Sequence, residues 1–136
     1  MATEYKILGQ YPDTEYLGGT ATRPVTTVQY QTVGHSVYFE SRIPDASYSK
    51  AEADATGKVN SAPLEDLFNI AGVTAVEWTQ VSQPTGYLAD EIVIYWTTPS
   101  GLSSGSVTRP FSGLSNTTAE PSIAAAIAAA TEVENL

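Results

Sequence analysis

The sequence predicts an α+β fold: a mostly antiparallel sheet of four to five strands, one or two short helices, and a C-terminal alanine-rich helix. Segments rich in β-branched and aromatic residues recur along the chain and are separated by Gly and Pro. Helical periodicity is confined to the middle of the chain and to its end. A chain of 136 residues suits a single domain over residues 1–136. We expect an N-terminal arm of strand and loop over 1–24, an α+β core over 25–113, and a linker with the last helix over 114–136.

The first half of the chain begins with strands. Residues 4–10 predict a short strand, and residues 11–24 predict a long loop because they contain two prolines, an aspartate and a pair of glycines. Residues 25–31 and 36–43 predict a hairpin that turns near Gly34.

Two short helices are expected next. Residues 49–59 are rich in Ala, Lys and Glu, although a glycine weakens their end. A second helix is predicted over 62–71, where Ser61 can cap the start and Gly72 can end it.

The second half repeats strands before a helix. Residues 73–81 alternate apolar and polar side chains, and residues 91–98 are rich in β-branched and aromatic residues. Together they predict an antiparallel hairpin. The glycine- and serine-rich stretch 101–113 contains at most a short strand at 107–111. Residues 121–134 predict the alanine-rich helix, and no internal sequence repeat is evident.

Charge and composition exclude several partners. The net charge is −9, from 15 acidic and 6 basic residues. The basic residues are scattered singly, which argues against binding to nucleic acid or to anionic membranes. The sequence has no cysteine, so thiolate chemistry and Cys-based metal sites are excluded. It has no apolar stretch of the roughly 20 residues that a membrane helix needs, and we expect no signal peptide.

No residue pattern predicts catalysis. The single histidine, His35, falls at a predicted hairpin turn, and no G-x-S-x-G, Walker or G-x-G-x-x-G motif occurs. We therefore expect no enzyme activity, no cofactor and no metal. A small hydrolase with paired carboxylates is the catalytic alternative. Its candidate pairs are Asp13/Glu15, Glu52/Asp54, Glu65/Asp66 and Asp90/Glu91.

Aromatic residues and the last helix indicate a binding surface. Tyrosine is common at protein interfaces because its ring is apolar and its hydroxyl is polar. Tyr5, Tyr11 and Tyr16 lie in the N-terminal arm. An alanine-rich helix buries little area by itself and needs a groove or a partner, to which Ile123 and Ile127 would be presented. We expect these five residues to contact a partner.

One stretch resembles a known family. Residues 61–76 are Ser-Ala-Pro-Leu-Glu-Asp-Leu-Phe-Asn-Ile-Ala-Gly-Val-Thr-Ala-Val, and a predicted strand follows. Residues 61–98 thereby resemble the N-terminal domain of NifU/Nfu-type iron–sulfur scaffold proteins, which shows a similar run before a β-hairpin. The resemblance implies a small α+β layer and, as one alternative function, an accessory binding module. The family's cluster-binding C-x-x-C is missing here.

The whole chain resembles the small structural proteins of tailed-phage virions in style. Shared features are Thr/Ser/Gly-rich strands, low charge content, absence of cysteine, long loops and an alanine-rich terminal helix. The resemblance implies a capsid decoration (cement) protein, located in the virion, that binds the major capsid protein and forms a homo-oligomer. A head–tail or tail structural component is the alternative within the same class.

Overall fold

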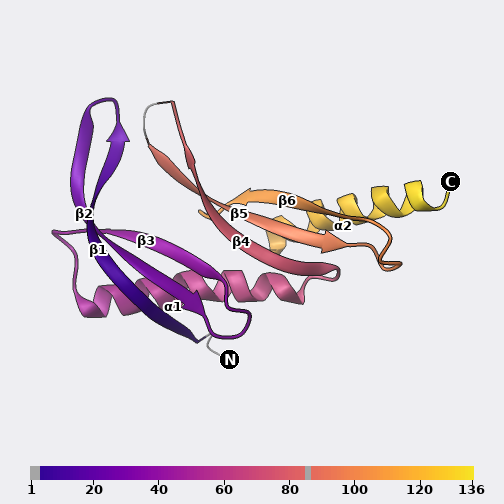
Figure 1. The fold of residues 1–136 in the computed structure, drawn as a ribbon, viewed down its shortest axis with the longest axis horizontal. Helices are drawn as coiled ribbons and strands as arrows, with labels where there is room; N and C mark the ends of the chain where they lie inside the picture. The colour runs from indigo at the N-terminus through magenta and orange to yellow at the C-terminus, as the bar shows by residue number, and fades with distance from the viewer. Residues whose placement is uncertain (1–3, 85–86) are drawn as a thin grey trace.

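The computed structural model describes residues 4–84 and 87–136. In this part of the chain, two three-stranded antiparallel sheets are each followed by a helix (Figure 1). Unit 1 consists of β1 (Tyr5–Gly18), β2 (Ala21–Thr32), β3 (Tyr38–Pro44) and α1 (Lys50–Asp66). The 3-10 turn η1 (Leu67–Asn69) leads to unit 2, which consists of β4 (Val73–Ser82), β5 (Leu88–Thr97), β6 (Ser104–Pro110) and α2 (Asn116–Glu134). The α+β class is confirmed, but the strands form two sheets rather than one sheet of four to five strands.

The two units repeat the same backbone pattern with a constant offset of 66 residues. Ile7 pairs with Tyr30 in unit 1, and Val73 pairs with Trp96 in unit 2. Each residue of the second pair lies 66 positions after its equivalent in the first. The strand pairs share even the same irregularity, between Ile7 and Gly9 and between Val73 and Ala75. The protein is therefore a tandem pair of βββα units.

Hydrogen bonds outside the ladders repeat at the same offset. The amide of Asp45 donates to the carbonyl of Pro24 over 3.2 Å, and the amide of Phe111 donates to the carbonyl of Asp90 over 3.0 Å. The helices start at equivalent N-caps, Ser49 and Ser115. Few aligned positions carry the same residue, and most of those that do lie at strand ends or helix starts. They include Thr32/Thr98, Pro44/Pro110, Ser49/Ser115 and Ala53/Ala119.

The two units fill their cores with different side chains. In unit 1, Tyr30 stacks on Phe39 with ring centroids 4.9 Å apart, and Gly57 leaves the room on α1 for Tyr30. In unit 2, Trp96 lies over Gly105, and the helix supplies Ile123. At one aligned pair the helix has Gly57 in unit 1 and Ile123 in unit 2, and at another the strand has Phe39 in unit 1 and Gly105 in unit 2. This exchange of volume hides the repeat from the sequence.

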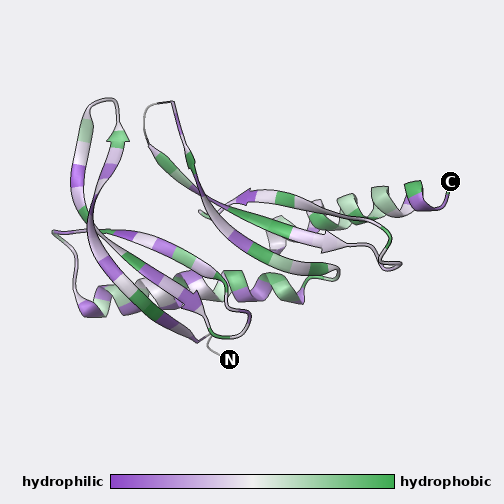
Figure 2. Ribbon diagram, viewed as in Figure 1, coloured by the Kyte–Doolittle hydropathy of each residue, from purple (hydrophilic) through white to green (hydrophobic). Residues whose placement is uncertain are grey.

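One hydrophobic cluster spans both units. Its buried members in regular elements lie on β2, β3, α1 and η1 in the first half of the chain and on β5 and α2 in the second. Phe39 of β3 contacts Phe111, which follows β6, edge to face with ring centroids 6.1 Å apart. Along the ribbon, hydrophobic and hydrophilic residues alternate in most strands, whereas α2 is weakly hydrophobic along most of its length (Figure 2). The units therefore share a core instead of folding around separate ones.

The expected loop over 11–24 is wrong, because these residues extend β1 and begin β2. Pro12 is tolerated because β1 is an edge strand, where an amide facing away from the ladder is not needed. Gly18 and Gly19 have φ values of 109° and 59°, which form the hairpin turn. The glycine pair marked a tight turn and not a long loop.

The two expected short helices are wrong as separate elements. Residues 50–59 and 62–66 belong to the single helix α1, which starts after the N-cap Ser49 and contains Pro63, and residues 67–69 form η1. The predicted hairpin of 73–81 and 91–98 is confirmed as β4 and β5. The last helix is confirmed but begins earlier than predicted, at Asn116, and the short strand at 107–111 belongs to the longer β6.

Candidate functional site

Two hairpin arms extend beyond the three-stranded sheets. β3 pairs with β2 only over Val25 to Gln31, so residues 14–24 form a two-stranded ribbon, which we call the first arm. The equivalent second arm consists of the described residues 80–84 and 87–90, beyond the last β6 partner at Glu91. Figure 1 shows both arms projecting on the same side, away from α1. A two-stranded ribbon is marginally stable alone, so these arms depend on support at their bases.

Arg42 of β3 supports both bases. Its side chain is only 8% exposed, and Nε lies 3.4 Å from Oε2 of Glu15 in the first arm. Nη2 lies 3.3 Å from Oδ2 of Asp90 and donates to the carbonyl of Leu88 over 3.3 Å, both in the second arm. Arg23 adds an ion pair to Glu15 at 2.6 Å. One guanidinium therefore fixes the two arms relative to each other.

Asp90 lies in a partly desolvated position within this network. Burial raises the pKa of its carboxyl, and the neighbouring Arg42 and the amide of Gln80 oppose that rise. The ion pair thus offsets a desolvation cost. We interpret it as a structural device that positions the second arm.

The arms expose large apolar side chains. Tyr16 and Leu17 near the first tip are 48% and 49% exposed, and Val81 and Tyr87 of the second arm are 39% and 42% exposed. Single exposed apolar residues are ordinary, but here four lie on two projecting ribbons on one side of the protein. This arm surface, made of Tyr16, Leu17, Val81 and Tyr87, is the candidate binding site.

The five contact residues predicted from the sequence differ in their exposure. Tyr11 and Tyr16 are exposed on β1, at 40% and 48%. Tyr5 is half-buried, and its hydroxyl donates to the carbonyl of Asp54 on α1 over 2.8 Å. Ile123 is completely buried, and Ile127 is half-buried against Gly72. Tyr5 and Ile123 thus serve the fold, and we drop them from the candidate surface.

Sequence reasoning missed Leu17, Val81, Tyr87 and the network of Arg42. The glycine pair at 18–19, which is typical of a hairpin turn, was the signal that could have located the first arm. Nothing in the sequence indicated Arg42, because its partners lie 27 and 48 residues away along the chain.

His35 braces a loop. Its Nδ1 lies 3.1 Å from Oε1 of Glu65, and its ring stacks on Phe68 with centroids 3.7 Å apart. Glu65 also accepts from the buried hydroxyl of Thr32 over 3.0 Å. In unit 2 the hydroxyl of Thr98 donates to Glu134 over 2.6 Å, which is a similar bond from strand end to helix end, although the position equivalent to Glu65 is Thr131. Within residues 4–84 and 87–136, no group of three or more His, Asp or Glu side chains could hold a metal ion.

One depression brings two acids together. It has a volume of about 310 Å³, and Glu40 and Asp90 both line it. The hydroxyl of Tyr38 donates to Glu40, and Arg42 pairs with Asp90. Both carboxylates are thus engaged within the protein, so the hydrolase alternative gains no free acid or base from them.

Neither of the long helices in the described ranges is both extended and apolar enough to cross a membrane. Comparison of the chain with protein-family models, curated proteins and solved structures gave no significant match.

Proposed function

We propose that the protein is a non-enzymatic structural component of a phage virion, a capsid decoration protein that stabilises the shell by binding the major capsid protein. The arm surface carries this proposal. Two ribbons project on one side and present exposed Tyr, Leu and Val side chains, and Arg42 holds their bases together. Such a pair of rigid, apolar-tipped arms suits insertion into the grooves of a protein lattice.

The mechanism is burial of area without chemistry. Tyrosine and leucine at the tips lose water on contact with a lattice, and aromatic anchors supply much of the affinity of protein interfaces. Because Arg42 restrains both arms before binding, less conformational entropy is lost when they dock. The net charge of −9 directs the protein towards a basic or neutral surface.

Co-sedimentation with capsids tests the proposal. The capsids come from the phage that encodes this chain and are assembled without it. We expect the wild-type protein to pellet with them saturably. The double variant Tyr16→Ser/Leu17→Ser removes two apolar anchors and should bind at least about tenfold more weakly.

Leu102→Ser is the matched control, because Leu102 is 80% exposed but lies on the turn between β5 and β6, outside the arms. This variant should bind like the wild type, and circular dichroism should show all three proteins equally folded. Failure of the wild-type protein to pellet, or unchanged binding by the double variant, would contradict the proposal.

A further inference from the structure

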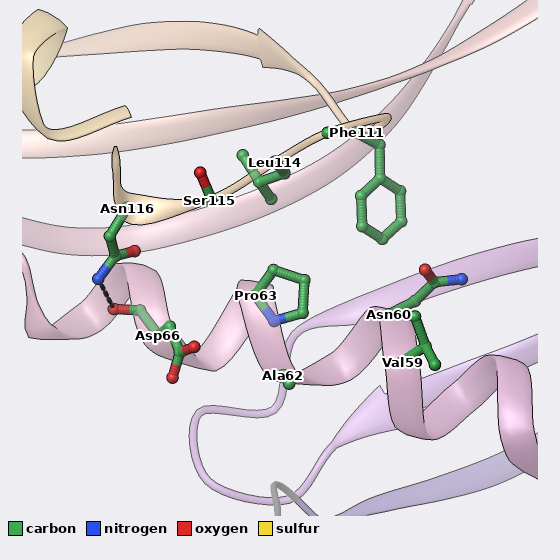
Figure 3. Close-up of a pocket in the computed structure, with 10 residues that line it drawn as sticks. Val59, Asn60, Ala62, Pro63, Asp66, Phe111, Leu114, Ser115 and Asn116 are labelled. Carbon is green, nitrogen blue, oxygen red and sulfur yellow. Dashed lines mark hydrogen bonds between the residues drawn. The ribbon is translucent and has the colours of Figure 1, made fainter. Parts of the chain in front are cut away.

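The two units meet through two different faces. Unit 1 contributes the outer edge of β3 and the C-terminal half of α1, where Tyr38 contacts Trp78 edge to face at 5.8 Å. Unit 2 contributes the base of its arm and loop 111–116, which runs into the first residue of α2, Asn116. The side-chain amide of Asn116 donates to the backbone carbonyl of Asp66 over 2.9 Å. A groove of about 470 Å³ runs between α1 and this loop (Figure 3). The contact is heterologous, because the two faces are not the same part of the unit.

Each face has a counterpart 66 residues away that is open. The counterpart of loop 111–116 is loop 45–50 of unit 1. The counterparts of Ala62 and Pro63, which line the groove on α1, are Ala128 and Ala129 on α2. In Figure 1, the C-terminal end of α2 projects beyond the second sheet.

Residues in the contact between the units are more buried than their counterparts at the open faces. Leu114 is 9% exposed in the contact between the units, whereas its counterpart Tyr48 is only half-buried. Ala62 and Pro63 are half-buried, whereas Ala128 and Ala129 are exposed. The chain thus holds one completed contact and leaves the two halves of an equivalent contact open at its opposite ends.

The open halves carry complementary charges. The backbone carbonyl of Asp66 accepts a hydrogen bond from the side chain of Asn116 inside the chain, and these two positions correspond at the open faces to Glu132 and Lys50. Both side chains belong to exposed residues. In a chain with a net charge of −9, copies repel one another in general, so a lysine placed opposite a glutamate favours this one arrangement.

We infer that copies of this chain associate head to tail, with the C-terminal half of α2 and the outer edge of β6 in one copy against loop 45–50 and the base of the first arm in the next. The contact repeats the one between unit 1 and unit 2. Because it is heterologous, it produces rings or filaments and does not stop at a dimer. The inference is independent of shell binding, since a protein that assembles without binding capsids would retain it.

Charge reversal tests the contact by sedimentation velocity over a wide range of concentrations. Glu132→Lys and Lys50→Glu each place like charges at every junction and should weaken association about tenfold. The double variant Glu132→Lys/Lys50→Glu restores opposite charges at every junction and should associate like the wild type.

Glu120→Lys is the control, because it makes the same charge change at an exposed position of α2 outside the proposed face. It should leave association unchanged. Ala129→Arg, which places a long side chain at the counterpart of Pro63, should abolish association while the protein remains folded. A wild-type protein that sediments as a 14.4 kDa monomer at all concentrations, that stops at a dimer, or whose double variant is not rescued would overturn the inference.

Discussion

At the residue scale, the packing of Tyr30 shows how one core position is fixed by another far along the chain. The ring is completely buried, its hydroxyl donates to the carbonyl of Ala53 over 2.7 Å, and burial raises its pKa. A Cβ at Gly57 would lie 2.6 Å from that ring and 2.8 Å from the ring of Tyr5. Gly57 is therefore needed for space and not for backbone freedom.

Gly57→Ala should destabilise the protein by about 1–3 kcal/mol, because the added methyl group overpacks two rings. In an open helix the same change would stabilise by about 1 kcal/mol. Urea unfolding measures the free energy of unfolding, with Lys58→Ala on the exposed neighbouring position as the control. A variant as stable as the wild type, or more stable, would show that Tyr30 does not pack as described.

Asp90 should make stability depend on pH. Burial raises its folded pKa above the ordinary 3.8, so its contribution to stability is complete below about pH 3.8 and is lost as pH rises through the raised value. Asp90→Asn lacks this titration. The free energy of unfolding, measured in urea, should therefore rise for the variant relative to the wild type as the pH increases from about 3 to about 7. A difference that stays constant would mean that the ion pair with Arg42 balances burial, and a difference that moves the other way would mean that it outweighs burial.

At the element scale, the two helices start in the same way but are capped differently. The hydroxyl of Ser49 accepts from the amide of Glu52 over 3.0 Å, whereas Ser115 makes no such side-chain bond. Both residues are extended, as an N-cap requires. The two helix starts thus share the same backbone conformation but not the same side-chain hydrogen bond.

Ser49→Ala should cost about 1 kcal/mol, because it removes a satisfied cap. Ser115→Ala at the equivalent position should cost clearly less. Thermal or urea unfolding of both variants measures this difference, and equal losses would argue that the caps act through backbone conformation alone.

Sequence reasoning succeeded where the pattern is local. The strands around Val28, Trp78 and Ile94 and the last helix were predicted because alternation and composition decide them. It failed at Pro12, which an edge strand tolerates, and at Pro63, which packing holds inside α1. Tyr16 was predicted as a surface residue from its type. The role of Arg42 could not be predicted because it depends on how two hairpins meet.

At the scale of the whole molecule, the chain is one unit built twice. The register, the irregularity in the first hairpin of each unit and the helix starts all repeat at 66 residues, although few residues coincide. Unit 1 combines a large strand residue, Phe39, with a helix glycine, Gly57, whereas unit 2 combines a strand glycine, Gly105, with a large helix residue, Ile123. Each unit thereby fills its core. A repeated unit with one internal heterologous contact is suited to extension by further copies, which agrees with the proposed structural role.

The most direct measurement is a disulfide test of the open faces, since the chain has no cysteine of its own. Asp66→Cys/Asn116→Cys replaces the two residues of the internal hydrogen bond and should give an oxidised monomer. Lys50→Cys/Glu132→Cys places cysteines at the equivalent open positions and should give a ladder of covalent multimers on a non-reducing gel. If this second variant stays monomeric while the first closes, the internal contact is not repeated between copies, and the account is contradicted.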